Sequence, residues 1–198
     1  MFDKNEAPGS SPVTGQMNMI FRARMLWRDL ATWMTIYLVS LYGGYPNQSA
    51  ISQKLYDLPL EYGNFLKFIF GDGTAEEAIH HLSSYIITLQ NLFYAQKIGD
   101  AAAAEEFAKQ LYQIMDDTAE FFARINPYWQ EETWRSLLYN YNKLLLEDSL
   151  TLLTEEYEKN IDVFDRILSF SSVAGDYFFE GIINYLNHTG NPPLKEMC

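Results

Sequence analysis

The residues of this sequence that could hold a metal ion are acidic side chains and a few histidines on segments of helical character. Glu77 and His80 form a Glu-x-x-His pair, and helical bundles hold two iron ions with two such pairs and two further Glu residues. The chain has three histidines, His80, His81 and His188, and no second pair of this kind. Glu77 can cap the helix it begins, and each of the first two histidines follows a glutamate by four positions on an exposed face. The sequence therefore favours a structural role for these residues over a histidine-based di-iron site.

Several carboxylates recur along the predicted helices, and most are expected on solvated faces. Asp165 and Asp176 stand out because their segment is otherwise rich in Val, Ile, Leu and Phe. A buried carboxylate must pair, take up a proton or bind a cation. Asp176 and Glu180 lie four residues apart, so they either converge on a cation or repel each other on one helical face.

The sequence shows no arrangement of a nucleophile with a base. Cys198 is the single cysteine and the last residue, which excludes a disulfide within the chain and a cysteine-based zinc site. There is no Gly-x-Ser-x-Gly element. The segment 71–73 (Gly-Asp-Gly) lacks the lysine that follows the glycines of a phosphate-binding loop, so it indicates a turn.

Residues 126–129 (Asn-Pro-Tyr-Trp), with Trp134 close behind, form an aromatic corner between two predicted helices. Two interpretations remain open at this point. The corner is either a packed loop between helices or the rim of a pocket for an apolar or aromatic ligand.

The segments that carry these residues have helical periodicity rather than the alternation of strands. The predicted helices span about 19–42, 49–70, 74–97, 100–125 and 131–187. Pro59 predicts a break at 57–58, Thr74 and Glu77 predict a capping box, and Gly99 followed by Asp100 predicts a helix end and a new helix start. We expect the last stretch to divide into two helices near 147–148.

Taken together, these elements predict an all-α fold, an antiparallel helical bundle of four to six helices, for which a ferritin-like outline is one arrangement. Residues 1–17 are expected to form a flexible N-terminal tail, residues 18–188 a single bundle domain, and residues 189–198 a C-terminal tail. The connection at 99–100 is so short that it predicts antiparallel packing of the helices on either side.

The overall charge and composition exclude several classes of protein. Lys and Arg number 14 against 26 Asp and Glu, a net charge of −12, which argues against binding to nucleic acid or to anionic lipid. An aromatic content of 16% is too high for a disordered chain. No segment has the roughly 20 apolar residues of a membrane-spanning helix, and the first 16 residues lack the apolar core of a signal peptide. We therefore expect a cytoplasmic protein without a membrane partner.

A set of short motifs resembles a family of small helical proteins of Gram-positive, mostly spore-forming bacteria, some of which carry the label acetylglutamate kinase. The resemblance covers roughly residues 26–182. The motifs that carry it are Leu26-Trp27, Trp33, Lys97-Ile98-Gly99-Asp100, Ile125-Asn126-Pro127-Tyr128-Trp129, Leu137-Leu138-Tyr139, Phe164-Asp165, Ala174-Gly175-Asp176 and Gly181-Ile182. Acetylglutamate kinases have an α/β fold with glycine-rich phosphate loops, and this sequence offers neither such strands nor such loops, so kinase activity is not expected.

The resemblance also bears on the candidate site. The family pattern has histidines at the positions of Leu30, Tyr85, Tyr141 and Phe170 and an acid at the position of Asn160, so this sequence has replaced all five. It keeps the acids of the pattern at Asp116, Asp165 and Asp176. If those histidines bind a metal in relatives, their replacement implies that this chain has lost the site and filled its interior. The pocket-lining candidates are Trp27, Trp33, Tyr85, Tyr141 and Phe170.

The leading hypothesis is a non-catalytic cytoplasmic bundle, without a cofactor, that binds a small ligand, a protein partner or a second copy of itself. The alternative is a metal-binding, ferritin-like bundle or a diverged relative of one. Its candidate ligands are the carboxylates Asp116, Asp165, Asp176 and Glu180. Another enzyme, including a kinase, ranks third.

Overall fold

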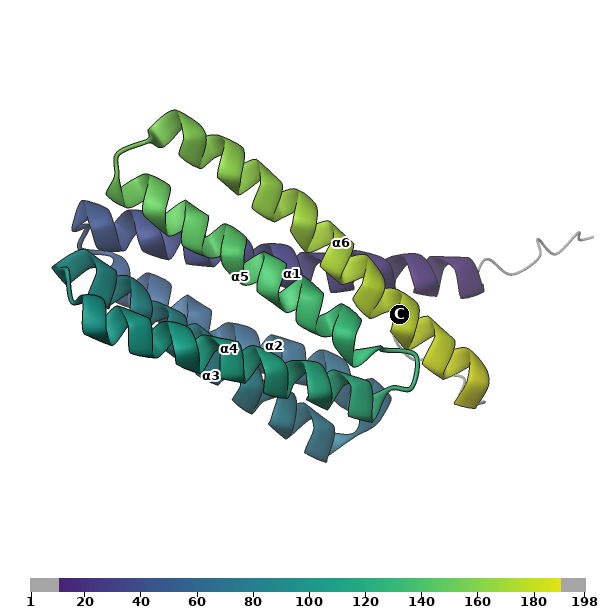
Figure 1. The fold of residues 1–198 in the computed structure, drawn as a ribbon. Helices are drawn as coiled ribbons and strands as arrows, with labels where there is room; N and C mark the ends of the chain where they lie inside the picture. Colours follow the sequence, from purple (N-terminus) through teal and green to yellow (C-terminus); the bar gives the residue numbers. More distant parts are fainter. Residues whose placement is uncertain (1–10, 190–198) are drawn as a thin grey trace, which may run out of the picture.

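The structure, a computed structural model, describes residues 11–189, with side chains from residue 17 onward, and is built from six helices (Figure 1). They are α1 (Ser11–Gly43), α2 (Gln48–Phe70), α3 (Asp72–Ile98), α4 (Ala101–Ile125), α5 (Glu131–Leu153) and α6 (Tyr157–Thr189). No strand occurs in this part of the chain. The predicted all-α bundle is therefore confirmed.

Short connections hold successive helices against one another. Gly71 alone separates α2 from α3, and two residues separate α3 from α4. Each helix packs against its neighbours in sequence, and α1 also packs against α5 and α6, which closes the bundle. Figure 1 shows α3 and α4 as one hairpin and α5 and α6 as another, with α1 running alongside the second. Buried side chains from all six helices form one continuous core between these hairpins.

The turn between α3 and α4 forms as the sequence predicts. Gly99 has a φ of 74°, the left-handed conformation that glycine adopts readily after a helix. The carboxylate of Asp100 accepts a hydrogen bond from the backbone N–H of Ala103 at 3.0 Å and so caps α4.

The break predicted at Pro59 does not occur. Helix α2 continues through Pro59 to Phe70, although proline lacks the N–H that would donate to Leu55. Leu58, Pro59 and Tyr62 are all buried in the core, so tertiary packing outweighs the local cost of the proline.

Three further helix ends differ from their predicted positions. Thr74 does not cap α3, because its hydroxyl donates to the carbonyl of Phe70 at 3.2 Å and the helix begins at Asp72. Helix α5 passes through 147–148 and ends at Leu153, with the chain reversing at Glu155, whose φ is 60°. Helix α1 begins at Ser11, inside the segment predicted to be a tail. Residues 1–10 and 190–198, where the rest of the two predicted tails falls, lie outside the described residues.

Across residues 11–189, none of the six helices is both long enough and apolar enough to span a bilayer.

Candidate functional site

Two of the predicted carboxylates are engaged in ion pairs near the surface. Asp116 accepts hydrogen bonds from Arg135 Nε at 2.9 Å and from the Tyr139 hydroxyl at 2.7 Å. Asp176 pairs in a bidentate manner with Arg24, at 2.5 and 2.8 Å. Their charges are thus compensated by arginines, and the two pairs join different helices, α4 to α5 and α1 to α6.

The other two carboxylates, Asp165 and Glu180, are exposed. Asp165 lines a shallow groove between α5 and α6 whose apolar side chains are Leu144, Phe170 and Val173. The carboxylate is therefore solvated beside apolar neighbours and not buried among them. Over the described part of the chain, no group of three or more His, Cys, Asp or Glu side chains is placed to hold a metal ion. The metal-binding alternative stays a prediction.

Among the described side chains, the buried carboxylate is that of Asp148, on α5, with an exposed fraction of 0%. Its two oxygens accept hydrogen bonds from the Thr35 hydroxyl and from Asn160 Nδ2, both at 2.6 Å. Burial raises the pKa of Asp148, and the two hydrogen bonds oppose that rise. The general expectation that the carboxylates lie on solvated faces does not hold for Asp148. Its direct neighbours in the sequence, Glu147 and Ser149, are polar, so the segment carries no clear signal of its burial.

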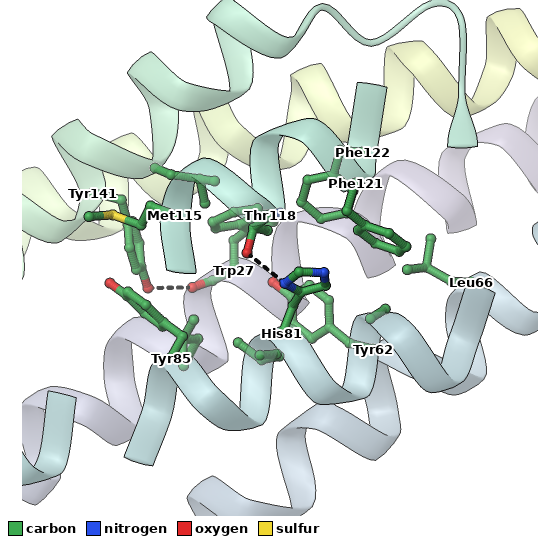
Figure 2. A pocket seen from close by; sticks show the side chains of 14 residues that line it. Trp27, Tyr62, Leu66, His81, Tyr85, Met115, Thr118, Phe121, Phe122 and Tyr141 are labelled. Carbon is green, nitrogen blue, oxygen red and sulfur yellow. Dashed lines mark hydrogen bonds between the residues drawn. The ribbon is translucent and has the colours of Figure 1, made fainter. Parts of the chain in front are cut away.

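A cavity lies at the centre of the bundle and is enclosed by five of the six helices (Figure 2). Its volume is about 50 Å³. Figure 2 shows side chains pointing into it from both sides, with the rings of Tyr62, His81 and Tyr85 below and Met115, Phe121 and Tyr141 above. The lining consists of Trp27, Leu30, Tyr62, Leu66, Ala78, His81, Leu82, Tyr85, Met115, Thr118, Phe121, Phe122, Leu138 and Tyr141.

The fold brings together three of the five predicted pocket residues. Trp27, Tyr85 and Tyr141 line the cavity, and so does Leu30, another position at which the family pattern has histidine. Phe170 lies in the surface groove between α5 and α6, and Trp33 is half-buried against the core without lining the cavity. The interior is therefore filled mainly by aromatic rings, but not completely.

The phenol groups of Tyr85 and Tyr141 already have acceptors. Tyr85 donates to Asn142 Oδ1 and Tyr141 to the Trp27 carbonyl, each at 3.2 Å. Burial raises the pKa of Tyr85 and of Tyr141 far above the ordinary value of a phenol. Both side chains are uncharged at neutral pH, and their hydroxyl hydrogens are directed at protein acceptors.

Two other polar groups of the lining have no partner. The Tyr62 hydroxyl and Trp27 Nε1 are buried and form no hydrogen bond with any described residue. Burial also raises the pKa of Tyr62 well above its ordinary value, so the hydroxyl keeps its hydrogen. Such unpaired buried groups are rare in folded proteins and call for an explanation. Sequence reasoning missed Tyr62; a tyrosine one turn after a buried proline carries no signal of its own.

The lining comes nearest to solvent between α3 and α4, where its half-buried residues lie. These are His81, Leu82 and Thr118; every other lining residue is buried. Thr118 Oγ1 lies 3.4 Å from His81 Nδ1 between these two helices (Figure 2). Burial lowers the pKa of His81, so the ring is uncharged at neutral pH, although the nearby Glu77 carboxylate opposes the shift. His81 was predicted to be exposed, and its half-buried place in the cavity lining corrects that.

The aromatic corner is a packed loop. Trp129 and Trp134 are buried at 2% and 0% exposure, and the Trp129 indole rests directly over Gly181 of α6. Asn126 Oδ1 accepts a hydrogen bond from the backbone N–H of Tyr128 at 3.0 Å, which shapes the turn. Neither tryptophan lines the central cavity.

The arrangement suits binding better than covalent chemistry. His81 and Thr118 are a base and a hydroxyl within reach, but the Thr118 hydroxyl donates to the Ile114 carbonyl at 2.6 Å and is not directed at the imidazole. The lining belongs entirely to helices, whose interior backbone amides are hydrogen-bonded within the helix. The cavity lining therefore has no free backbone N–H groups that could stabilise an oxyanion.

Comparison with models of known protein families gives no match, and neither does a search of curated proteins or of solved structures.

Proposed function

We propose that this protein is a non-catalytic, cytoplasmic helical bundle that binds a small uncharged molecule in its central cavity. The observation that carries the proposal is the lining itself. It is a shell of aromatic and aliphatic side chains, contributed by five helices, and it is least buried between α3 and α4. Ligand sites between the helices of bundles have this form.

The electrostatics of the cavity support an uncharged ligand. The lining contains no Lys, Arg, Asp or Glu. His81 is held neutral by burial, and the tyrosines are held neutral for the same reason. An ion placed here would lose its water and find no counter-charge, which is strongly unfavourable.

The size of the cavity sets a condition on entry. An engineered apolar cavity that holds benzene has a volume of about 150 Å³, about three times that of the present one. A ring can enter only if the lining moves. Met115 is a flexible side chain that can change rotamer. His81 and Thr118 can separate, because their contact is long. We therefore expect the ligand to be small.

Filling the cavity tests the proposal. Ala78 lines it, so Ala78→Leu should occupy the space, whereas Ala102→Leu adds the same side chain on an exposed part of α4. Benzene should stabilise the wild type and the Ala102→Leu protein by about 1.4 kcal/mol at ten times its Kd and leave Ala78→Leu unchanged. Thermal unfolding with and without benzene measures this. Equal stabilisation of all three proteins, or of none, contradicts the proposal.

A second candidate role, contact with a protein partner or a second copy, is favoured by one surface feature. Met25 and Phe68 line an outer groove between α1 and α2, and Phe68 is 70% exposed. The groove is also lined by Arg22, Asp29, Glu61 and Asn64. Exposed apolar side chains rimmed by polar residues are typical of interaction surfaces. Light scattering across a range of concentrations tests self-association. If the wild type has the molar mass of a monomer at every concentration, and Phe68→Glu has the same molar mass, a second copy does not occupy this groove.

A further inference from the structure

We propose that the molecule bound in the cavity is a small planar ring with one uncharged hydrogen-bond acceptor, and that Tyr62 and Trp27 donate to this acceptor. The inference rests on the proposed function and specifies its ligand. Four buried side-chain atoms have no partner among the described residues, and two of them belong to the cavity lining, the Tyr62 hydroxyl and Trp27 Nε1. The other two, Asn126 Nδ2 and Trp134 Nε1, lie outside the lining. The inference is carried by the pair in the lining.

Both groups are donors under ordinary conditions. An indole N–H can only donate, and a phenol whose pKa is raised by burial keeps its hydrogen. Figure 2 shows the Tyr62 ring extending from α2 toward His81, with its hydroxyl at the inner end. A carbonyl oxygen, an ether oxygen or a ring nitrogen would satisfy such donors, whereas a ligand without an acceptor would leave them unpaired.

The other hydroxyl groups of the lining are already engaged. The hydroxyls of Tyr85 and Tyr141 donate to Asn142 and to the Trp27 carbonyl. The Thr118 hydroxyl donates to Ile114 and contacts His81. Tyr62 and Trp27 are therefore the buried residues of the lining whose polar side-chain atoms have no partner among the described residues.

The arrangement of the rings favours a planar ligand. Trp27 stacks on Trp134 with a centroid separation of 5.9 Å and an interplanar angle of 16°. Tyr62 and Tyr141 meet Trp27 edge-on, at 79° and 81°. A flat ring can continue such stacked and edge-to-face contacts, because aromatic rings prefer these two geometries.

Benzene and pyridine separate the two parts of the inference, since they have the same size and differ by one acceptor. At about pH 8, where pyridine is uncharged, Tyr62→Phe should weaken pyridine binding about fivefold to tenfold. The same substitution should leave benzene binding within about twofold. Tyr85→Phe is the matched control, because its hydroxyl is directed at Asn142; it should change the affinities for both rings by the same factor. Titration calorimetry or ligand-observed NMR gives the affinities.

A spectroscopic measurement complements the variants. The ¹⁵N chemical shift of pyridine moves when the ring nitrogen accepts a hydrogen bond, so bound pyridine should show that shift in the wild type and lose part of it in Tyr62→Phe. Trp27→Phe should remove a further part. If Tyr62→Phe unfolds, the wild-type shift still decides the question.

The possible results distinguish an error in the assigned acceptor from an error in the proposed ligand-binding function. If benzene and pyridine both bind but Tyr62→Phe weakens them equally, or if bound pyridine shows no hydrogen-bonded shift, the acceptor is wrong while the ligand-binding function stands. If neither ring binds the wild type, the cavity holds at most water and the proposed function itself falls.

Discussion

At the scale of single residues, Asp148 is the most demanding group to bury. It is fully enclosed, and the side chains that satisfy its oxygens, Thr35 and Asn160, come from α1 and α6. Asn160 Nδ2 also lies 3.0 Å from Thr151 Oγ1. One carboxylate thus links three helices at the end of the bundle where α5 turns into α6.

Asp148→Ala should lower the free energy of unfolding by about 2 kcal/mol, because the buried donors of Thr35 and Asn160 would lose their acceptor. Urea unfolding monitored by circular dichroism measures the change. Asp165→Ala is the control, since Asp165 is exposed and should shift stability by less than about 0.5 kcal/mol. Similar values for the two variants would show that the network around Asp148 contributes little.

His81 should make stability depend on pH. Its folded pKa is lowered by burial, so the unfolded chain binds a proton at a higher pH than the folded protein. The stability contributed by the neutral ring is complete above the unfolded value of about 6.5 and decreases as the pH falls from there through the lowered folded pKa.

The contribution of His81 to this pH dependence is measured by comparing the free energy of unfolding of the wild type with that of His81→Gln between about pH 8 and pH 5. The wild type should lose more stability than the variant as the pH falls. Parallel pH profiles would mean that His81 becomes protonated without cost in the cavity lining.

The family resemblance predicted part of the site, whereas residue type alone did not. Tyr85 and Tyr141 are candidates because the resembling family has histidine at their positions, and both line the cavity with Trp27. Size and apolarity alone do not select them, because Phe170 and Trp33 are also large and apolar and do not line it. Asp165 and Asp148 were misplaced because each lies in a segment with apolar residues on more than one side. Periodicity then does not specify which face turns inward, and the packing of neighbouring helices decides it.

At the scale of elements, the crossing of α1 and α6 depends on a small residue. A Cβ atom added at Gly175 would lie 2.7 Å from the Cα of Arg24, which is backbone and cannot turn aside. The close approach also positions the Arg24–Asp176 ion pair that spans the two helices. The glycine is therefore part of how α6 is seated.

Gly175→Ala should cost about 2 kcal/mol of stability, because the helices would have to separate to admit the methyl group. Gly73→Ala is the matched control: Gly73 lies in α3, and a Cβ there would meet nothing within 4 Å. The control should leave stability unchanged or raise it by up to about 1 kcal/mol, since alanine favours helix. Chemical denaturation of both variants decides, and equal effects would contradict the close-approach argument.

Pro59 offers a test of how packing overrides local preference. Pro59→Ala restores an N–H for the Leu55 carbonyl, worth up to about 3 kcal/mol, and removes a buried ring, which costs about 1–2 kcal/mol. We expect a net gain of about 1 kcal/mol in the free energy of unfolding. A loss of stability would show that the ring contributes more to the core than its place in the helix costs.

Helix boundaries could be predicted where local chemistry determines them and not where long-range packing does. Gly99 and Asp100 form a turn that needs only their own backbone and side-chain preferences. Pro59 opposes a helix locally, but the burial of its neighbours Leu58 and Tyr62 depends on helices distant in the sequence. The stabilisation that comes from this burial cannot be deduced from the sequence of the segment around Pro59 alone.

At the scale of the whole molecule, the net charge of −12 makes the folded state repel itself. Raising NaCl from about 0.02 M to about 0.5 M shortens the Debye length and should raise the urea midpoint. A lower midpoint at high salt would contradict this. It would mean that surface ion pairs stabilise the fold by more than the repulsion between excess negative charges destabilises it; the pairs of Arg135 with Asp116 and Glu131 are examples.

The stacked pair of Trp27 and Trp134, with Trp129 edge-on to Trp134 at a centroid distance of 5.6 Å, has an optical consequence. Indole rings this close share excitation energy, so their near-ultraviolet absorption acquires a coupled circular dichroism signal, and light absorbed by one ring can be emitted by another. Because Trp27 is also part of the cavity wall, a guest ring would disturb this shared excited state directly. The bundle thus carries an intrinsic chromophore whose spectrum reports the occupancy of its own interior without any added label.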